Sequence, residues 1–199
     1  MKIKVHEVRG FDPAIKGMRF PMDSNHLSDS YCDIIGPNDL ELCRKLIKAG
    51  PSHRKFLRQI MIWVEVTASL KWWDEFDTYL HTVKNSSSQM HKLGNRLLNK
   101  DDFENHISDK FLSIVNSKIM TYMSEKNQGN WRAMIDVIPQ SFLYKRMVML
   151  NYETILTMYP NRINHKMFEW KAFLREILAE CAYLEMFLSF LLKEEENND

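Results

Sequence analysis

The chain of 199 residues is 45% hydrophobic and 12% aromatic, which provides enough apolar side-chain surface for a hydrophobic core. It contains only 6 glycines and 6 prolines, a low share that favours helices and argues against disordered and collagen-like classes. Lys and Arg number 27 against 26 Asp and Glu, and the resulting net charge of +1 argues against a protein that coats a polyanion.

The N-terminal part of the chain predicts a strand followed by a helix. Residues 2–9 alternate between apolar and polar side chains, as a half-buried strand does. Residues 36–39 are typical of a helix start capped by Asn38 or Asp39. Apolar residues at helical spacing follow, and the predicted helix ends before Gly50.

Residues 60–69 give the clearest strand signal in the sequence. Five apolar residues point to one side (Ile60, Ile62, Val64, Val66 and Ala68) and five others to the opposite side. One face of this strand is expected to join the core and the other to form a surface for a partner.

The middle of the chain predicts three helices. The segment 72–80 contains neither Gly nor Pro and is read as a helix, and a polar loop over 84–88 then caps a second helix over 89–98. Apolar residues recur at every fourth position from 103 to 123, which predicts a long amphipathic helix with Asp101 and Asp102 at its start.

The C-terminal part of the chain is expected to be entirely helical. A break over 127–130 precedes a short helix over 131–137, and Pro139 opens a helix that runs to Pro160. A final apolar helix is predicted over 164–193.

These elements predict one mostly helical α+β domain over residues 1–193 and a solvated acidic tail over 194–199. The three cysteines have neither metal nor redox spacing, and the first residues lack the apolar run of a secretion signal. No stretch approaches the roughly 18 apolar residues of a membrane-spanning helix. We therefore expect a reduced, cytoplasmic protein without a membrane span.

The common catalytic and metal-binding motifs are absent from the sequence. It contains no phosphate-binding glycine loop, no nucleophile elbow and no paired Cys-x-x-Cys, and the seven histidines lack helical ligand spacing, so no metal site is predicted. Two basic clusters are present, one at residues 54–58 and one at 84–100. Such clusters are either solvated helix faces or an anion site, to which the hydroxyls of residues 86–88 would contribute.

The order of several segments resembles the flavin-dependent thymidylate synthases. Ser52-His53 precedes the strand 60–68, and a helix then runs into Asp77-Thr78-Tyr79, where that family has Arg-His-Arg, before a Ser/Asn loop. Further matches are the Pro139, Arg146, Asn151, Arg162 and Glu169-Trp170 positions. The resemblance covers about residues 50–175 and rests on order and spacing.

The resemblance implies an α+β fold in which helices pack on an antiparallel sheet, with a helical C-terminal half. It also implies reductive methylation of deoxyuridylate, with FAD, NADPH and methylenetetrahydrofolate, by a homotetramer in thymidylate (dTMP) biosynthesis. The cofactors carry most of that chemistry, so the protein mainly positions ligands and compensates charge.

The matched positions imply two sets of site residues. His53, Asp77, Tyr79 and Asn85 fall at cofactor positions, and Ser87, Ser88, Gln89 and Arg146 fall at nucleotide positions. The other interpretation of His53 is an exposed residue at a helix start. That of Ser87 and Ser88 is a helix cap, and that of Arg146 is a surface cation.

The departures from the family pattern concern charge. Asp77-Thr78-Tyr79 replaces two arginines, and Asn85 and Gln89 stand where the family has Glu and Arg. A cation about 4 Å from a phosphate contributes roughly 4 kcal/mol at an effective dielectric constant near 20, and an acid reverses that sign.

Three hypotheses follow from this sequence. The first is a divergent enzyme of the flavin-dependent thymidylate synthase type. The second is a catalytically inactive homologue that binds a nucleotide or a partner protein. The third is nucleic-acid binding through residues 84–100, which the near-neutral charge disfavours.

Overall fold

The computed structural model describes residues 1–88, 92–105 and 107–192, and the predicted tail 194–199 lies outside them. The chain forms two compact units, each made of separate chain segments. The first unit comprises Met1–Lys2, Val66–Thr78 and Asn85–Met147, and the second comprises Ile3–Glu65, Tyr79–Lys84 and the chain from Val148 onward. Among the described residues no helix is both long enough and apolar enough to cross a bilayer.

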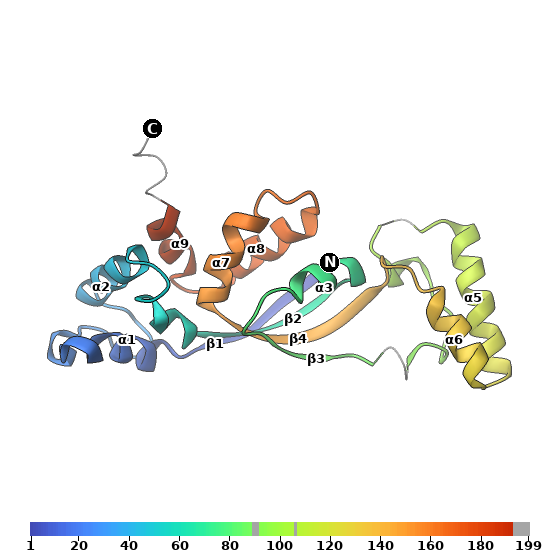
Figure 1. The fold of residues 1–199 in the computed structure, drawn as a ribbon, viewed down its shortest axis with the longest axis horizontal. Helices are drawn as coiled ribbons and strands as arrows, with labels where there is room; N and C mark the ends of the chain where they lie inside the picture. The colour runs from blue at the N-terminus through green and yellow to red at the C-terminus, as the bar shows by residue number, and fades with distance from the viewer. Residues whose placement is uncertain (89–91, 106, 193–199) are drawn as a thin grey trace. The chain divides into compact units, whose positions relative to one another are not determined.

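Four strands form an antiparallel sheet in the order β1-β2-β4-β3 (Figure 1). The strands are β1 (Lys2–Arg9), β2 (Met61–Ser69), β3 (Val83–Ser86) and β4 (Leu143–Asn151). Both predicted strands are confirmed. In β2 the apolar set is fully buried, whereas Met61, Trp63 and Glu65 on the other face are half-buried, so the alternation in the sequence reports the buried face correctly.

The second unit contains helices α1 (Phe11–Arg19), α2 (Pro37–Lys48), α7 (Tyr152–Arg162), α8 (Phe168–Glu180) and α9 (Leu184–Leu192). Short 3₁₀ turns lie at Phe20–Met22, Asn25–Leu27 and Lys55–Arg58. Helix α2 packs against α9, and α7 packs against both α8 and α9. Aromatic side chains meet edge-on in this core, with Phe11 against Tyr152 at 5.7 Å between ring centroids.

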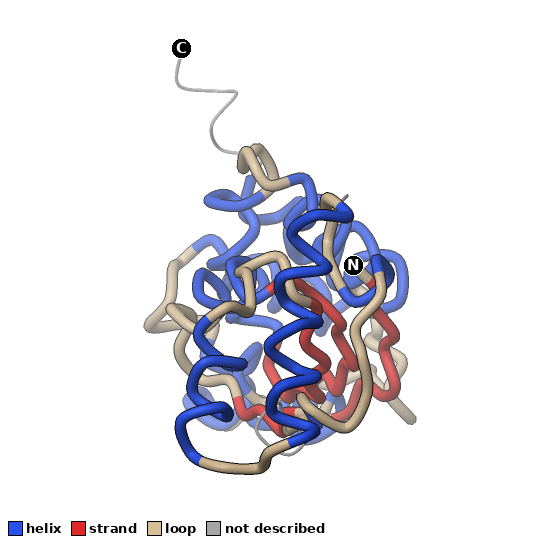
Figure 2. The backbone as a smooth tube through the Cα atoms, turned by 90° about the vertical axis from the view of Figure 1, so that its right-hand side faces the viewer, coloured by secondary structure: helices blue, strands red, loops and turns tan. Residues whose placement is uncertain are grey.

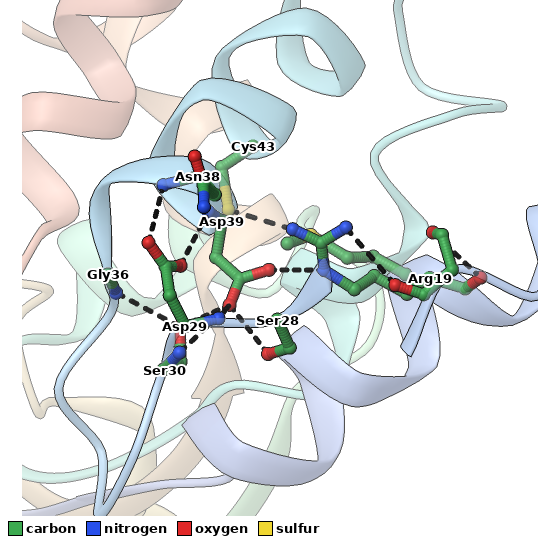
Figure 3. Close-up of polar contacts among 10 residues, drawn as sticks. Arg19, Ser28, Asp29, Ser30, Gly36, Asn38, Asp39 and Cys43 are labelled. Atoms are coloured by element: carbon green, nitrogen blue, oxygen red, sulfur yellow. Dashed lines mark hydrogen bonds and ion pairs between the residues drawn. The ribbon is translucent and has the colours of Figure 1, made fainter. Parts of the chain in front are cut away.

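The start of α2 is capped by a residue outside the helix (Figure 3). The sequence predicted Asn38 or Asp39 as the cap, but the carboxylate of Asp29 accepts the backbone N–H groups of both residues, at 2.8 and 3.1 Å. The N-cap position is Gly36, where an added Cβ would lie 2.3 Å from Asp29 Cγ. Glycine is therefore required there to admit the external carboxylate.

Asp39 instead forms the centre of a buried polar network in the second unit (Figure 3). Its Oδ1 accepts Arg19 Nε at 2.5 Å, and its Oδ2 accepts the hydroxyls of Ser28 and Ser30 at 2.7 and 2.6 Å. The backbone N–H groups of Asp29 and Ser30 also donate to Oδ2. Both charges are almost fully removed from water, so each depends on the other for compensation.

The first unit contains α3 (Leu70–Phe76), α5 (Asp109–Ser124) and α6 (Gln128–Asp136), together with a 3₁₀ turn at Lys100–Asp102. Helices α5 and α6 pack against each other (Figure 2). Their shared core holds the buried side chains of Leu93, Leu98, Phe103, Val115, Ile119 and Met134.

The prediction of one helix over residues 139–160 is wrong, because this segment contains strand β4. Leu143–Asn151 is a strand between β2 and β3, and Pro139 closes a turn by accepting the N–H of Phe142. Leucine and methionine are compatible with either structure, so pairing in the sheet decides the conformation here. Pro160 was predicted to end the helix but lies inside α7, close to its last residue.

Other helix boundaries also differ from the prediction: the helix predicted over 72–80 is α3 (Leu70–Phe76), and the one predicted over 131–137 is α6 (Gln128–Asp136). The amphipathic helix begins at Asp109 rather than near 103, because Asn99 and Asp102 form a capping box around a separate 3₁₀ turn and Ser108 caps α5. The final helix is divided into α8 and α9 by residues 181–183, where Tyr183 has a left-handed φ of 62°. Of the predicted helix 89–98, residues 89–91 are outside the described residues and 93–96 form turns and a bend.

Part of the predicted polar loop 84–88 belongs to strand β3. This strand has only four residues and lies at an edge of the sheet, where polar side chains can face solvent. The loop prediction failed because polar composition alone does not exclude an edge strand.

The cysteines differ in exposure, and we expect them to differ in reactivity. Cys32 is exposed, whereas burial raises the pKa of the Cys43 and Cys181 thiols to about 12. Because the thiolate is the reacting species, a thiol reagent at pH 8 should label one cysteine in the native protein and all three after denaturation. Mass spectrometry of the labelled peptides checks this, and rapid native labelling of Cys43 or Cys181 would contradict it.

Candidate functional site

The residues matched to cofactor and nucleotide positions are distributed over both units. The first unit holds Asp77, Asn85, Ser87, Ser88 and Arg146, and the second holds His53 and Tyr79. Gln89 lies outside the described residues.

In the first unit, Asp77 and Arg146 form an ion pair. Arg146 Nη1 lies 2.9 Å from both carboxylate oxygens of Asp77. Asp77 is the C-cap residue of α3, where its backbone N–H bonds back to Trp73 O, and Arg146 lies on β4. An acid at the negative end of a helix is unfavourable by itself, and the guanidinium compensates for that charge.

Arg146 lies against two aromatic rings. Its Cζ is 4.4 Å from the ring centroid of Trp73 and 5.2 Å from that of Tyr144, two residues earlier on the same face of β4. The Trp73 indole donates to Tyr144 O at 2.9 Å, which fixes the tryptophan beneath the guanidinium. The Arg146 side chain is 15% exposed, so the guanidinium is held in place and largely shielded from water.

Ser87 and Ser88 line a cavity of about 190 Å³ in the first unit. Its wall also contains Lys92, Leu93, Arg96, Leu98, Asp102, Phe142, Leu143 and Tyr144. The N–H of Ser87 donates to Lys145 O at 3.0 Å, which positions the two serines beside β4. Arg146 is not among the lining residues, but Tyr144 contacts it and borders the cavity.

Two cations of the basic cluster at 84–100 are compensated by acids, and one of them, Arg96, lines the cavity. Arg96 forms an ion pair with Asp102, and Lys100 pairs with Asp109 at 2.7 Å. Burial alone would raise the pKa of Asp102, but hydrogen bonds from Arg96 and the backbone of Asn99 outweigh burial and lower it. The basic cluster at 84–100 is therefore less cationic than its composition suggests, which further disfavours nucleic-acid binding.

In the second unit, His53 is exposed and lines a cavity of about 420 Å³. The wall of this cavity is largely apolar, with Met18, Met22, Leu42, Leu46 and Phe56 among its residues. Tyr79 is not part of it. His53 and Tyr79 are thus not brought together within this unit.

Tyr79 belongs to a second arrangement of an arginine on aromatic rings. Arg162 Nε donates to Tyr79 Oη at 2.8 Å, and its Cζ lies 4.7 Å from the ring centroid of Trp170. The sequence pattern identified Arg162 and Trp170 as matched positions but assigned no contact to them. Arg162 is the last residue of α7 and Trp170 lies in the first turn of α8, so the connection between these helices produces the contact.

Sequence interpretation missed Tyr144 and did not anticipate that Asp77 would pair with Arg146. Both depend on β4, which was predicted as a helix. In the structure Val148 and Leu150 are buried on one side of β4, but the residues before them show no regular alternation that would have identified the strand from the sequence. Among the described residues, no group of three or more His, Cys, Asp or Glu side chains is arranged to hold a metal ion.

Comparison with known proteins identifies the fold. The sequence matches no protein-family model and no curated protein. The structure is similar to that of the flavin-dependent thymidylate synthase ThyX from Helicobacter pylori complexed with FAD and dUMP. The TM-score is 0.75 at 15% identity, over 96% of this chain and 100% of that chain.

Two further structures give the same result. A second structure of H. pylori ThyX with FAD and dUMP has a TM-score of 0.74 at 14% identity, over 96% of this chain and 99% of that chain. The UMP/dUMP methylase PolB from Streptomyces cacaoi, bound with 5-Br dUMP, has a TM-score of 0.67 at 13% identity, over 96% and 94%. The chain therefore has the fold of the flavin-dependent thymidylate synthases, as its sequence pattern predicted.

Proposed function

We propose that this protein binds a pyrimidine nucleotide and that its reaction is reductive methylation of deoxyuridylate or a related nucleotide. The main support for this proposal is the fold. The structural similarity extends over 96% of the chain, and the similar proteins are complexed with dUMP or 5-Br dUMP. The reaction requires FAD, a reductant such as NADPH and methylenetetrahydrofolate as the one-carbon donor. We also propose that the protein is a cytoplasmic homotetramer that acts in dTMP biosynthesis. Residues 1–193 would then form a single functional domain.

The cavity at Ser87 and Ser88 supports binding of a phosphate. It offers two hydroxyl groups and the cationic side chain of Lys92, whereas the charge of Arg96 is compensated by its ion pair with Asp102 in the same wall. Its volume of about 190 Å³ is below the roughly 300 Å³ at which small-molecule pockets begin. The cavity thus fits the phosphate end of a nucleotide rather than the whole molecule.

The residues at 77–79 do not fit the phosphates of a flavin dinucleotide. Asp77 provides a carboxylate, which repels a phosphate, and its partner Arg146 is already engaged. The proposal therefore requires that other cations of the chain hold the flavin phosphates.

A catalytically inactive homologue is the second candidate. The Asp77–Arg146 ion pair favours it, because the pair removes the charge that a flavin-binding site would use. Such a protein would bind a nucleotide or a partner protein and carry out no methyl transfer.

The visible absorption spectrum of the purified protein, followed by titration with FAD and then dUMP, tests the proposal. A flavin band that changes on addition of dUMP, with formation of dTMP when reductant and folate are supplied, is the expected result. Binding of dUMP without flavin or turnover would establish the second candidate instead.

Serine variants test the location of the nucleotide. Replacing both Ser87 and Ser88 by alanine should weaken dUMP binding about tenfold or more, because each hydrogen bond contributes about 0.5–1.5 kcal/mol. Ser86→Ala is the matched control, since Ser86 is exposed and does not line the cavity. Equal affinities in calorimetric titrations of the wild type and the double variant would remove the cavity from the proposal.

A further inference from the structure

The Asp77–Arg146 pair is asymmetric in its exposure. The Arg146 side chain is 15% exposed and lies on Trp73 and Tyr144, whereas the Asp77 side chain is 40% exposed at the end of α3. The guanidinium is therefore the fixed member of the pair, and the carboxylate is the member that solvent can reach. An incoming anion would compete with Asp77 for a cation that is already oriented.

The guanidinium also has unused hydrogen-bonding capacity. Nη1 of Arg146 donates hydrogen bonds to both carboxylate oxygens of Asp77. Nε of Arg146 is buried and has no hydrogen-bond acceptor within the part of the chain that the structure describes. Buried donors of this kind normally have a partner. A ligand oxygen could supply one, provided that its own charge outweighs that of Asp77.

The position of the pair connects it to the proposed nucleotide site. Tyr144 lines the cavity with one part of its surface and contacts Arg146 with its ring. A phosphate bound beside Ser87 and Ser88 would be attracted electrostatically by Arg146, but the negative charge of Asp77 would offset most of that attraction. The net charge of the pair is zero, so each additional phosphate on a ligand gains little from it.

We infer that Asp77 determines ligand specificity by neutralising Arg146, so that this site accepts nucleosides and monophosphates in preference to ligands with a diphosphate. This inference rests on the proposed function for the identity of the nucleotide. The neutralisation itself rests on the contacts of Asp77 and Arg146 alone, and inorganic pyrophosphate can therefore probe it directly.

The test is a calorimetric titration at constant low ionic strength with inorganic pyrophosphate and, separately, with dUMP. Asp77→Asn should bind pyrophosphate at least tenfold more tightly than the wild type, and should gain less for dUMP. Asparagine is well tolerated at the end of a helix, so the variant is expected to fold. Asp74→Asn is the matched control, because Asp74 is an exposed acid of the same helix and its loss changes the net charge equally.

A second variant identifies the cation. Adding Arg146→Met to Asp77→Asn removes the charge while keeping a side chain that packs on Trp73, and it should abolish the gain in pyrophosphate affinity. No gain in Asp77→Asn, an equal gain in Asp74→Asn, or a gain that survives Arg146→Met would each overturn the inference. If pyrophosphate follows the expected pattern but no variant binds dUMP, the neutralisation of Arg146 by Asp77 stands, whereas the nucleotide preference and the proposed function fail.

Discussion

Replacing Asp39 by alanine is expected to lower the free energy of unfolding by about 3–5 kcal/mol, the usual cost of leaving one charge of a buried ion pair alone. Arg19 would keep its buried guanidinium without the carboxylate that now lies 2.5 Å from its Nε. The hydroxyls of Ser28 and Ser30 and two backbone N–H groups would lose the same acceptor. For a chain of this size the melting temperature should fall by about 6–20 °C.

The pH dependence of this variant follows from the pKa of Asp39. Burial alone would raise that pKa, but hydrogen bonds from Ser30, Ser28 and Arg19 outweigh burial and hold it below the usual range of a carboxyl group. The stabilisation is therefore complete above the unfolded pKa of about 4 and is lost as the pH falls through the lower, folded value. The difference between wild type and Asp39→Ala should shrink on acidification below pH 4.

Glu41→Ala provides the control for the loss of an acid from the same helix. Glu41 is exposed and pairs with Arg44 at the surface, so its removal should change the melting temperature far less. Thermal unfolding followed by circular dichroism gives both values. Similar decreases in the two variants would show that the network around Asp39 does not stabilise the fold as described.

Replacing Gly10 by alanine is expected to destabilise the protein by about 3 kcal/mol or more, from left-handed backbone strain and steric overlap together. Gly10 has a φ of 104°, and an added Cβ would lie 2.3 Å from the backbone oxygen of Gln59. The obstacle is main chain rather than a flexible side chain, so relief requires movement of the segment before β2.

Gly50 is a matched control for backbone strain without overlap. Its φ is 97°, close to that of Gly10, but an added Cβ would meet no atom within 4 Å. Gly50→Ala should therefore cost only about 1–2 kcal/mol. Urea denaturation of the two variants separates the contributions, and equal losses would show that the contact with Gln59 relaxes without cost.

The elements that sequence predicted well are those in which burial follows a simple period. In β2 the alternation from Ile60 to Ala68 coincides with the buried face, and Val115 and Ile119 mark the buried face of α5. The fold class could also be predicted, because the order of segments between 50 and 175 resembles a known architecture and the structural comparison confirms it.

The elements that sequence predicted poorly depend on contacts distant in the chain. Residues 143–151 form a strand because β2 and β3 lie on either side, and nothing in their composition excludes a helix. The cap of α2 comes from Asp29, which lies eight residues before Pro37 and has no sequence signal that identifies it as a cap.

The sequence predicted which residues belong to the candidate site better than it predicted which of them contact one another. Ser87 and Ser88 do share a cavity, and Arg146 lies beside a residue of its wall. The pairing of Asp77 with Arg146 required knowledge of β4, because two residues 69 positions apart meet only when that strand is in place. Whether the matched residues bind cofactor or nucleotide remains a prediction.

The short length and polar character of β3 have a consequence for behaviour at high concentration. The outer strands of the described sheet are β3, with Lys84, and β1, which carries Lys2, Lys4 and Arg9 at exposed positions. Arg9 is paired with Glu7, so the net positive charge of β1 comes from Lys2 and Lys4, and charged side chains on an edge strand disfavour pairing with a strand of another molecule. We therefore expect these short or charged edge strands to disfavour fibril-like strand addition, even though the central strand β2 is strongly apolar.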